Sequence, residues 1–259
     1  MEKPFDDVYA SLESQLCGSP VEVEDSPAVL AARQRTDFEG FLALGKALSR
    51  QLRYKEAIEA YTAALDICPS NLTALRLRAG RYLTTLQSNL AIQDFRSCLT
   101  LGGDLLDCGY RMGLAFYYAG AYPAAMTQFE SCNPLCDDEM GIAVIYWHTL
   151  CAYRLGVEPA LLRSYRTGMD VGHHTAYEKA VQVFAGEMAA EKLLAQCDRE
   201  PEDMEAVIAM YGAYRYLGGR DASLCRRILK RDGFWPCFSY LAAWNDSANL
   251  KKLDFLPVL

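Results

Sequence analysis

The side chains of this chain that could do chemistry are, first of all, its ten cysteines and three histidines. Two local groups stand out: Cys132 with Cys136, and the pair His173-His174, with Glu178 one helical turn after His174. Structural zinc sites usually show two close cysteine pairs, or a cysteine pair and a histidine pair at a set spacing. One loose cysteine pair does not meet that requirement, so we expect no metal site.

Catalytic and nucleotide-binding motifs point the same way. The sequence contains no glycine-rich phosphate loop, no G-x-S-x-G and no H-E-x-x-H. A cysteine nucleophile paired with His148, His173 or His174 is an alternative that no motif selects. We therefore expect no enzyme, no catalytic residues and no cofactor. An enzyme or metalloprotein with an unrecognised Cys/His site is the least favoured alternative.

The elements that must position these residues recur along the chain. Residues 38–69 predict two amphipathic helices joined by a short turn, and their small and aromatic positions return twice at intervals of 34 residues. A period of this length is typical of stacked helical repeats. The five matching columns are Gly45/Ala79/Gly113, Leu48/Tyr82/Phe116, Ala57/Ala91/Ala125, Tyr61/Phe95/Phe129 and Ala64/Cys98/Cys132.

Cysteine usage fits the same pattern. Cys98 and Cys132 fall in a small-residue column, which predicts buried, unreactive side chains. The cysteines form no even, closely spaced framework of the kind found in secreted miniproteins. This distribution favours a reducing compartment.

The first repeat explains why such units must stack. Phe41, Leu44 and Leu48 share one face of the first predicted helix. Gly45 and Ala57 are small where the two helices should approach most closely, because the distance between helix axes depends on the side chains at the contact. One hairpin cannot bury its apolar face alone, so neighbouring units must cover it.

This pattern resembles the tetratricopeptide repeat family, whose units place an aromatic, Leu-Gly and Tyr in the first helix and Ala, Phe and Pro in and after the second. The pattern departs from the family at Leu48, where Tyr is preferred, and at Gly103 and Asp137, where the closing Pro is absent. The resemblance implies an all-α fold, a right-handed α-α superhelix, and a non-enzymatic scaffold that binds a peptide or protein in a concave groove. The residues that carry it are Phe41, Leu44, Gly45, Ala57, Tyr61, Ala64 and Pro69 in the first unit and Met112, Gly113, Phe116, Gly120, Tyr122, Ala125 and Phe129 in the third.

Three regions follow from this pattern. We expect an N-terminal acidic segment with a capping helix over 1–35 and three repeat units over 36–137, and then degenerate hairpins with a C-terminal aromatic cap over 138–259. Ser26-Pro27 predicts a helix start, Thr36 with Glu39 predicts a capping box, and Pro159 predicts the start of another helix. The three repeat units are placed at about 38–71, 72–105 and 106–137.

The groove implied by the resemblance would be lined by solvent-facing residues of each first helix. Arg and Tyr are the types that most often anchor interfaces, and a cationic surface favours an acidic peptide or a C-terminal carboxylate. The alternative is that these are ordinary solvated positions without a ligand. The candidate peptide-binding residues are Lys46, Arg50, Arg76, Tyr110, Arg111, Tyr117 and Tyr118.

Composition restricts the partners. The formal net charge of −7 argues against non-specific nucleic-acid binding and against a polybasic membrane anchor. No segment reaches the ~18 uninterrupted apolar residues of a membrane helix, and the acidic N-terminal stretch lacks the apolar run of a signal peptide. We therefore expect a cytoplasmic protein whose partners are neither nucleic acid nor membrane.

The C-terminal part leaves two interpretations open. An aromatic cluster there either seals the end of the stack or forms a dimer or partner surface, since aromatic residues are enriched at interfaces. A self-associating structural module, a homodimer, is thus the main alternative to a peptide-binding scaffold. The cluster consists of Phe234, Trp235, Phe238, Tyr240 and Trp244.

A second resemblance concerns the middle of the chain. The segment Arg111–Gly120, the dipeptide Tyr146-Trp147 and the segment Val183–Leu194 resemble the organisation of bacterial tetratricopeptide lipoprotein adaptors, which are dimeric. The lipid-attachment signal of those proteins does not occur in this sequence. The resemblance therefore implies only a bacterial origin and dimerisation.

Overall fold

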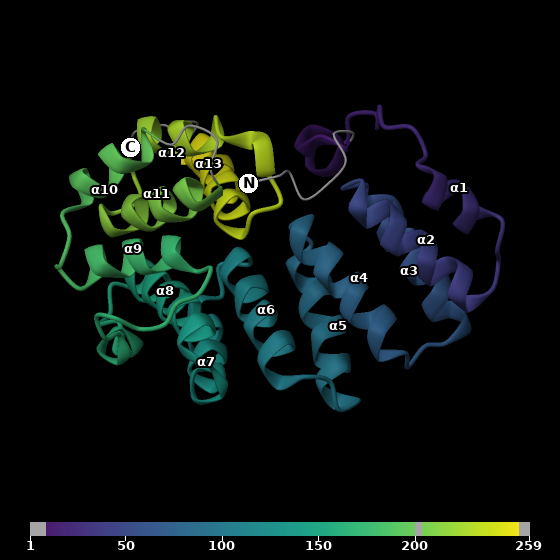
Figure 1. Cartoon of the computed structure of the whole chain (residues 1–259), viewed down its shortest axis with the longest axis horizontal. Coiled ribbons are helices and arrows are strands. Elements are labelled where there is room, and N and C mark those ends of the chain that lie inside the picture. Colours follow the sequence, from purple (N-terminus) through teal and green to yellow (C-terminus); the bar gives the residue numbers. More distant parts are fainter. Residues whose placement is uncertain (1–8, 200–203, 254–259) are drawn as a thin grey trace. The chain divides into compact units, whose positions relative to one another are not determined.

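The computed structural model describes residues 9–199 and 204–253, and among them it contains helices and no strand. The prediction of an all-α fold is confirmed (Figure 1). The helices are α1 Pro27–Arg33, α2 Phe38–Arg50, α3 Tyr54–Ile67, α4 Leu72–Thr84, α5 Ser88–Thr100, α6 Leu105–Tyr118, α7 Tyr122–Cys132, α8 Asp138–Leu155, α9 Thr175–Phe184, α10 Ala190–Cys197, α11 Met204–Tyr216, α12 Ala222–Leu229 and α13 Phe238–Leu253.

Consecutive helices pack as hairpins. Helix α2 packs against α3, α3 against α4, and α4 against α5; in the later part of the chain α7 packs against α8, and α8 against α9. None of the helices in the described residues is long and apolar enough to cross a membrane. The chain forms two compact units, residues 1–115 and residues 116–259, called here the first and second unit. The predicted boundaries of the repeat units come from the 34-residue period of the sequence and not from compactness, and they remain a prediction.

The small-residue columns explain the close packing of the hairpins. Ala57, Ala91 and Ala125 are completely buried, each 0% exposed. A Cβ atom added at Gly45 would lie 2.3 Å from the ring of Tyr61, a residue that is itself buried. The sequence therefore needs a glycine on α2 where the ring from α3 approaches.

A further feature recurs at the repeat interval but was not predicted. The turn between the two helices of each hairpin contains one residue with positive φ: Leu52 at 56°, Leu86 at 57° and Gly120 at 75°. Glycine adopts this left-handed conformation without penalty, whereas a residue with a Cβ is strained in it. The first two turns therefore hold a leucine at a position that favours glycine.

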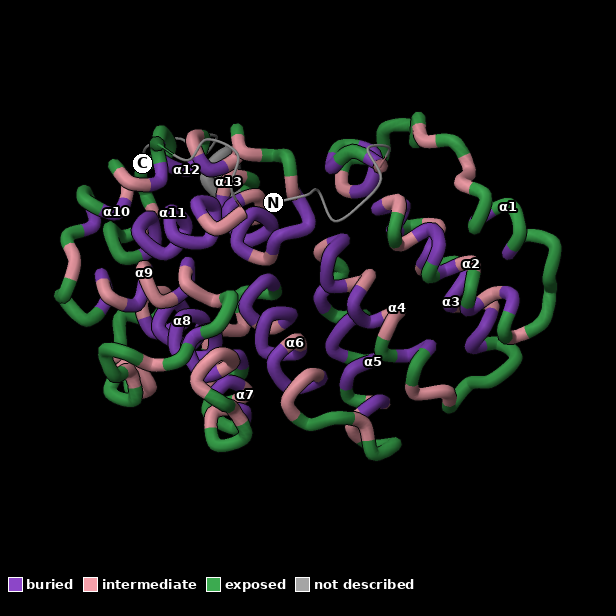
Figure 2. Tube along the Cα trace, viewed as in Figure 1, coloured by how far each residue is buried: buried purple, intermediate pink, exposed green. Residues whose placement is uncertain are grey.

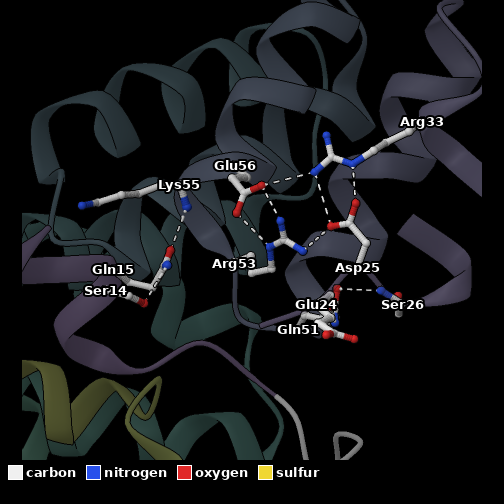
Figure 3. A network of polar contacts seen from close by, with 10 residues as sticks. All are labelled: Ser14, Gln15, Glu24, Asp25, Ser26, Arg33, Gln51, Arg53, Lys55 and Glu56. Atoms are coloured by element: carbon white, nitrogen blue, oxygen red, sulfur yellow. Dashed lines mark hydrogen bonds and ion pairs between the residues drawn. The ribbon is translucent and has the colours of Figure 1, made fainter. Parts of the chain in front are cut away.

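The N-terminal segment is bound to the turn of the first hairpin. The backbone N–H of Ala10 donates to the Gln51 carbonyl at 2.9 Å. The N–H of Lys55 donates to Gln15 Oε1 at 3.0 Å, as Figure 3 shows. Arg53, only 6% exposed, forms ion pairs with Asp25 and with Glu56 at 2.5 and 2.6 Å. These contacts hold the described part of the predicted capping segment on the first hairpin.

Helix ends test several local expectations. Ser26 caps α1 through the N–H of Val29, with Pro27 in the first turn, as predicted. The cap of α2 is Asp37, whose carboxylate accepts from the N–H of Gly40, so the prediction of a capping box at Thr36 is wrong by one residue. The helix predicted to begin at Pro159 is only the short 3₁₀ segment Ala160–Ser164.

The core of the second unit is built around two helices that are buried on every side. Helix α8 is buried from Gly141 to Ala152 and α11 from Ala206 to Arg215 (Figure 2). Their sequences lack the polar face of an amphipathic helix, which is the expected pattern for a helix surrounded by others. In the C-terminal aromatic cluster, Trp235 and Tyr240 are each 2% exposed, which agrees with a sealing role.

Candidate functional site

Two of the predicted groove cations meet at one carboxylate in the first unit. Nη1 of Arg76, on α4, lies 3.1 Å from Asp107 Oδ2, and Nε of Arg111 lies 2.7 Å from Asp107 Oδ1. All three side chains are partly exposed, at 45%, 32% and 31% for Arg76, Arg111 and Asp107. Lys46 and Arg50 are exposed on α2, and no contact among the described residues brings them into this cluster. We call Arg76, Asp107 and Arg111 the arginine pair site.

In the arginine pair site two guanidinium groups share the carboxylate of Asp107, and the carboxylate of Asp104 lies next to it, where it accepts from the Asp107 N–H at 2.6 Å. Burial raises the pKa of Asp107, but Arg111 and Arg76 outweigh burial and hold that pKa below its ordinary value. Asp107 is therefore a carboxylate at neutral pH, and two guanidinium groups share it. Guanidinium groups bind carboxylates and phosphates in bidentate geometry. The arrangement can accept a second anionic group from outside.

A second arginine on the same helix, Arg78, is largely buried and has its own partner, so it does not compete for Asp107. Arg78 donates to both carboxylate oxygens of Asp94 at 2.7 and 2.9 Å, and its Nη1 donates to Thr62 at 3.2 Å. This pair ties α4 to α5 and to the preceding hairpin. Side chains two positions apart on a helix point in different directions. Arg76 therefore faces away from the contact between Arg78 and Asp94. No sequence pattern predicted this pair, although the spacing of Arg78 and Asp94 places both inside one hairpin.

The three predicted groove tyrosines do not face solvent. Tyr110, Tyr117 and Tyr118 are 8%, 2% and 6% exposed, so the expectation that these positions are solvent-facing is wrong. In the second unit, Tyr118 donates to the carbonyl of Phe238 at 2.8 Å, and Asn245 Nδ2 donates to the carbonyl of Tyr118 at 3.0 Å. Helix α13 thus covers Tyr118. The assignment of these tyrosines to a peptide-binding groove remains a prediction.

Tyr117 belongs to a buried polar cluster. Its hydroxyl lies 2.8 Å from that of Tyr211, which donates to Asp246 Oδ2 at 3.1 Å. Asp246 also pairs with Arg154, and with Nη1 of Arg215 at 3.6 Å. Burial raises the pKa of Tyr117 to about 12, so its hydroxyl stays protonated and can donate. Asp246 is 92 residues from Arg154, and no local sequence signal could have joined them.

Stacked antiparallel helical hairpins with a recurring turn define a helical repeat protein. Residues 38–71 match the family model described as "Tetratricopeptide repeat". This match supports the resemblance of the chain to tetratricopeptide repeat proteins. Proteins of this family are typically non-enzymatic interaction scaffolds.

Two curated relatives and one solved structure are similar to parts of the chain. "Tetratricopeptide repeat protein 36" of Caenorhabditis elegans is 39% identical over 59 residues, 23% of this chain and 33% of that protein. "Outer dynein arm-docking complex subunit 4" of Xenopus laevis is 24% identical over 126 residues, 49% of this chain and 22% of that protein. The chain thus spans a third or less of the length of these relatives. Both are animal proteins, so the expected bacterial origin remains a prediction.

The solved structure is YrrB, described as a TPR protein with an unusual peptide-binding site. It is 14% identical, with a TM-score of 0.44, and the match covers 87% of this chain and 100% of that one.

Proposed function

We propose that this protein is a non-enzymatic scaffold that binds an acidic segment or a C-terminal carboxylate of a partner protein at the arginine pair site. The single observation that carries the proposal is that Arg76 and Arg111 share one carboxylate on an exposed surface. An incoming carboxylate can bind between the two guanidinium groups without a large desolvation cost, because the side chains are already partly hydrated. Lys46 and Arg50 lie on the exposed side of α2 and would add a longer-range attraction.

The role of Asp107 makes the proposal specific. A ligand carboxylate must compete with Asp107 for the same donors. Removing that competitor with Asp107→Asn should tighten binding, whereas the charge reversals Arg76→Glu and Arg111→Glu should weaken it. A surface that is merely solvated would show neither effect.

The test uses fluorescence anisotropy with the full chain. The labelled peptide Gly-Ser-Leu-Asp-Glu-Leu is measured with a free and with an amidated C-terminus. We expect Arg76→Glu with Arg111→Glu to raise Kd by about tenfold or more, equivalent to about 1.4 kcal/mol or more. Arg220→Glu, an exposed arginine of the second unit, is the matched control and should leave Kd unchanged. Equal Kd values for the wild type, the double reversal and Asp107→Asn would refute the proposal.

Self-association through the C-terminal aromatic residues is the second candidate. The burial of Trp235 and Tyr240 leaves less aromatic surface for it, so the scaffold is favoured. Light scattering at micromolar concentration separates the two, because a homodimer doubles the mass of 28.9 kDa. A cytoplasmic location agrees with the proposed function and is tested by imaging the tagged protein in its native cell. The name of the Xenopus relative, a docking complex subunit, agrees with a scaffold role.

A further inference from the structure

The buried polar cluster of the second unit contains more positive than negative charge. Arg154 on α8 and Arg215 on α11 pair with one carboxylate, that of Asp246 on α13. Among the residues that the structure describes, no other acid lies within ion-pair distance of either arginine. The hydroxyls of Tyr117 and Tyr211 beside them are neutral, because burial raises the pKa of both. Two guanidinium groups and one carboxylate therefore leave one positive charge over.

Arg215 is the less satisfied of the two arginines. Its side chain is 7% exposed, and its Nε has no hydrogen-bond partner among the described residues. Its Nη1 lies 3.6 Å from Asp246 Oδ2, which is beyond hydrogen-bond distance, and its Cζ lies 5.6 Å from the centre of the Tyr214 ring. Both oxygens of Asp246 already accept from other donors, Oδ1 from Arg154 and Oδ2 from Tyr211. Arg215 thus takes only a distant share of this carboxylate.

Other arginines with little exposure are completely paired. Arg53, whose side chain is also 7% exposed, donates to two carboxylates, and one of them accepts at both of its oxygens. Arg78, at 18%, donates to both oxygens of Asp94. A buried charge is costly unless it is paired and hydrogen-bonded. By this comparison Arg215 lacks an acceptor that Arg53 and Arg78 have.

The guanidinium group of Arg215 lies against the turn that follows α11. A Cβ atom added at Gly219 would overlap its Nη1, so the side chain touches the backbone of this turn. Gly218 is exposed, and a Cβ atom added there would meet no atom within 4 Å. Open space therefore begins one residue away from the guanidinium group. Arg220, the next residue of the turn, is exposed and adds a positive charge that attracts anions.

We propose that the second unit binds one small inorganic anion of the size of chloride at Arg215, beside the turn Gly218-Gly219. The anion accepts the hydrogen bond that the guanidinium group lacks and balances the charge that Asp246 leaves over. An exposure of 7% leaves no room for a peptide carboxylate at Arg215. The site is therefore distinct from the arginine pair site, whose side chains are 31–45% exposed.

Thermal denaturation followed by tryptophan fluorescence tests this proposal, because Trp147, Trp235 and Trp244 all belong to the second unit. The full chain is measured in sodium gluconate and in sodium chloride at the same ionic strength of about 0.15 M, so that screening is equal. An ion that binds only the folded state raises the Tm by mass action. We expect the Tm to be about 3–6 °C higher in chloride, the shift for a concentration about tenfold above Kd.

Three variants separate the site from a general salt effect. Arg215→Met removes the excess charge and leaves Asp246 paired with Arg154, so its Tm should be the same in both salts and in gluconate no lower than that of the wild type. Arg215→Lys keeps the charge and should keep a Tm that depends on chloride. Arg76→Met is the matched control: Arg76 also shares one carboxylate but is 45% exposed, so this variant should respond to chloride as the wild type does.

Chloride NMR gives a readout that does not depend on stability, since exchange of chloride with a protein site broadens its resonance. We expect the wild type and Arg76→Met to broaden it and bromide to reverse the effect by competition, whereas Arg215→Met should not broaden it. Equal Tm values of the wild type in the two salts, a chloride resonance that is not broadened, or broadening that is unchanged in Arg215→Met overturns the proposal. Either of the first two results would mean that water alone meets the donors of Arg215.

Discussion

Each of the two units contains two arginines that share one aspartate. In the first unit, Arg76 and Arg111 hold Asp107, and the three side chains are 31–45% exposed. In the second unit, Arg154 and Arg215 hold Asp246, and the corresponding values are 6–18%. In the second cluster the aspartate comes from α13, which packs against α11, the helix of Arg215.

Burial changes what the same three groups can do. An exposed pair contributes about 0–1 kcal/mol and can exchange its partner for a ligand. A buried pair has no access to a peptide ligand, and removing one member leaves a charge without compensation. The exposed cluster is therefore suited to binding a peptide, and the buried cluster to fixing α8, α11 and α13 in one arrangement.

The largest expected effect follows from breaking the buried cluster. Asp246→Ala leaves two buried guanidinium groups without a carboxylate and should destabilise the protein by about 3–5 kcal/mol. Asp107→Ala, the matched change in the first unit, should cost about 1 kcal/mol or less. Urea denaturation followed by circular dichroism measures both. Similar losses in the two variants would show that the two clusters do not differ in the way their burial implies.

Close helix packing provides the next test in each unit. A Cβ atom at Gly45 would lie 2.3 Å from the ring of Tyr61, and one at Gly212 would lie 2.7 Å from the Cβ of Ala180. Gly45→Ala and Gly212→Ala should each destabilise by about 1–3 kcal/mol through overpacking. Gly80→Ala is the control: it lies in α4 with no atom within 4 Å of the added Cβ, so it should be neutral or stabilising. A stable Gly45→Ala variant would contradict the close approach.

Acid sensitivity should separate the two units, because all three histidines lie in the second. Burial lowers the pKa of His148 below 6.5, although Glu130, 3.2 Å away, opposes this shift. The neutral ring is favoured in the folded state, so its contribution to stability is present above pH 6.5 and is lost as the pH falls through the folded pKa. The protection factors of the α8 amides, which correct for the pH dependence of intrinsic exchange, should fall over that range, whereas those of α4 should not. His148→Gln should remove this loss of protection; its persistence would assign the effect to another group.

The smallest expected effect concerns the hairpin turns. Leu86 has a φ of 57° and is only partly buried, so Leu86→Gly should relieve strain and stabilise by about 1 kcal/mol. Gly120→Ala, at the equivalent turn near the start of the second unit, should destabilise by about 1 kcal/mol. Thermal denaturation of both variants measures the difference. A loss of stability in Leu86→Gly would mean that leucine packing outweighs the strain.

The sequence predicted the repeating features because they depend on local spacing. Ala57, Ala91 and Ala125 are buried as their columns implied, and Arg76 and Arg111 lie on partly exposed surface. It failed for Tyr117 and Tyr118, since Tyr117 contacts Tyr211 on α11 and Tyr118 contacts Phe238 on α13, both more than 90 residues later. Helical periodicity identifies which face of a helix is distinctive but not which later segment will pack against it.

The aspartate that completes the buried cluster has a consequence for how the chain acquires its structure during synthesis. Arg154 leaves the ribosome 92 residues before Asp246. Until that residue emerges, the second unit carries two arginines without their shared counter-ion. The first unit makes its own ion pairs within residues 1–115 and needs nothing from the later chain for them. A nascent chain halted shortly before Asp246 should therefore hold a protease-resistant first half and a cleavable second half.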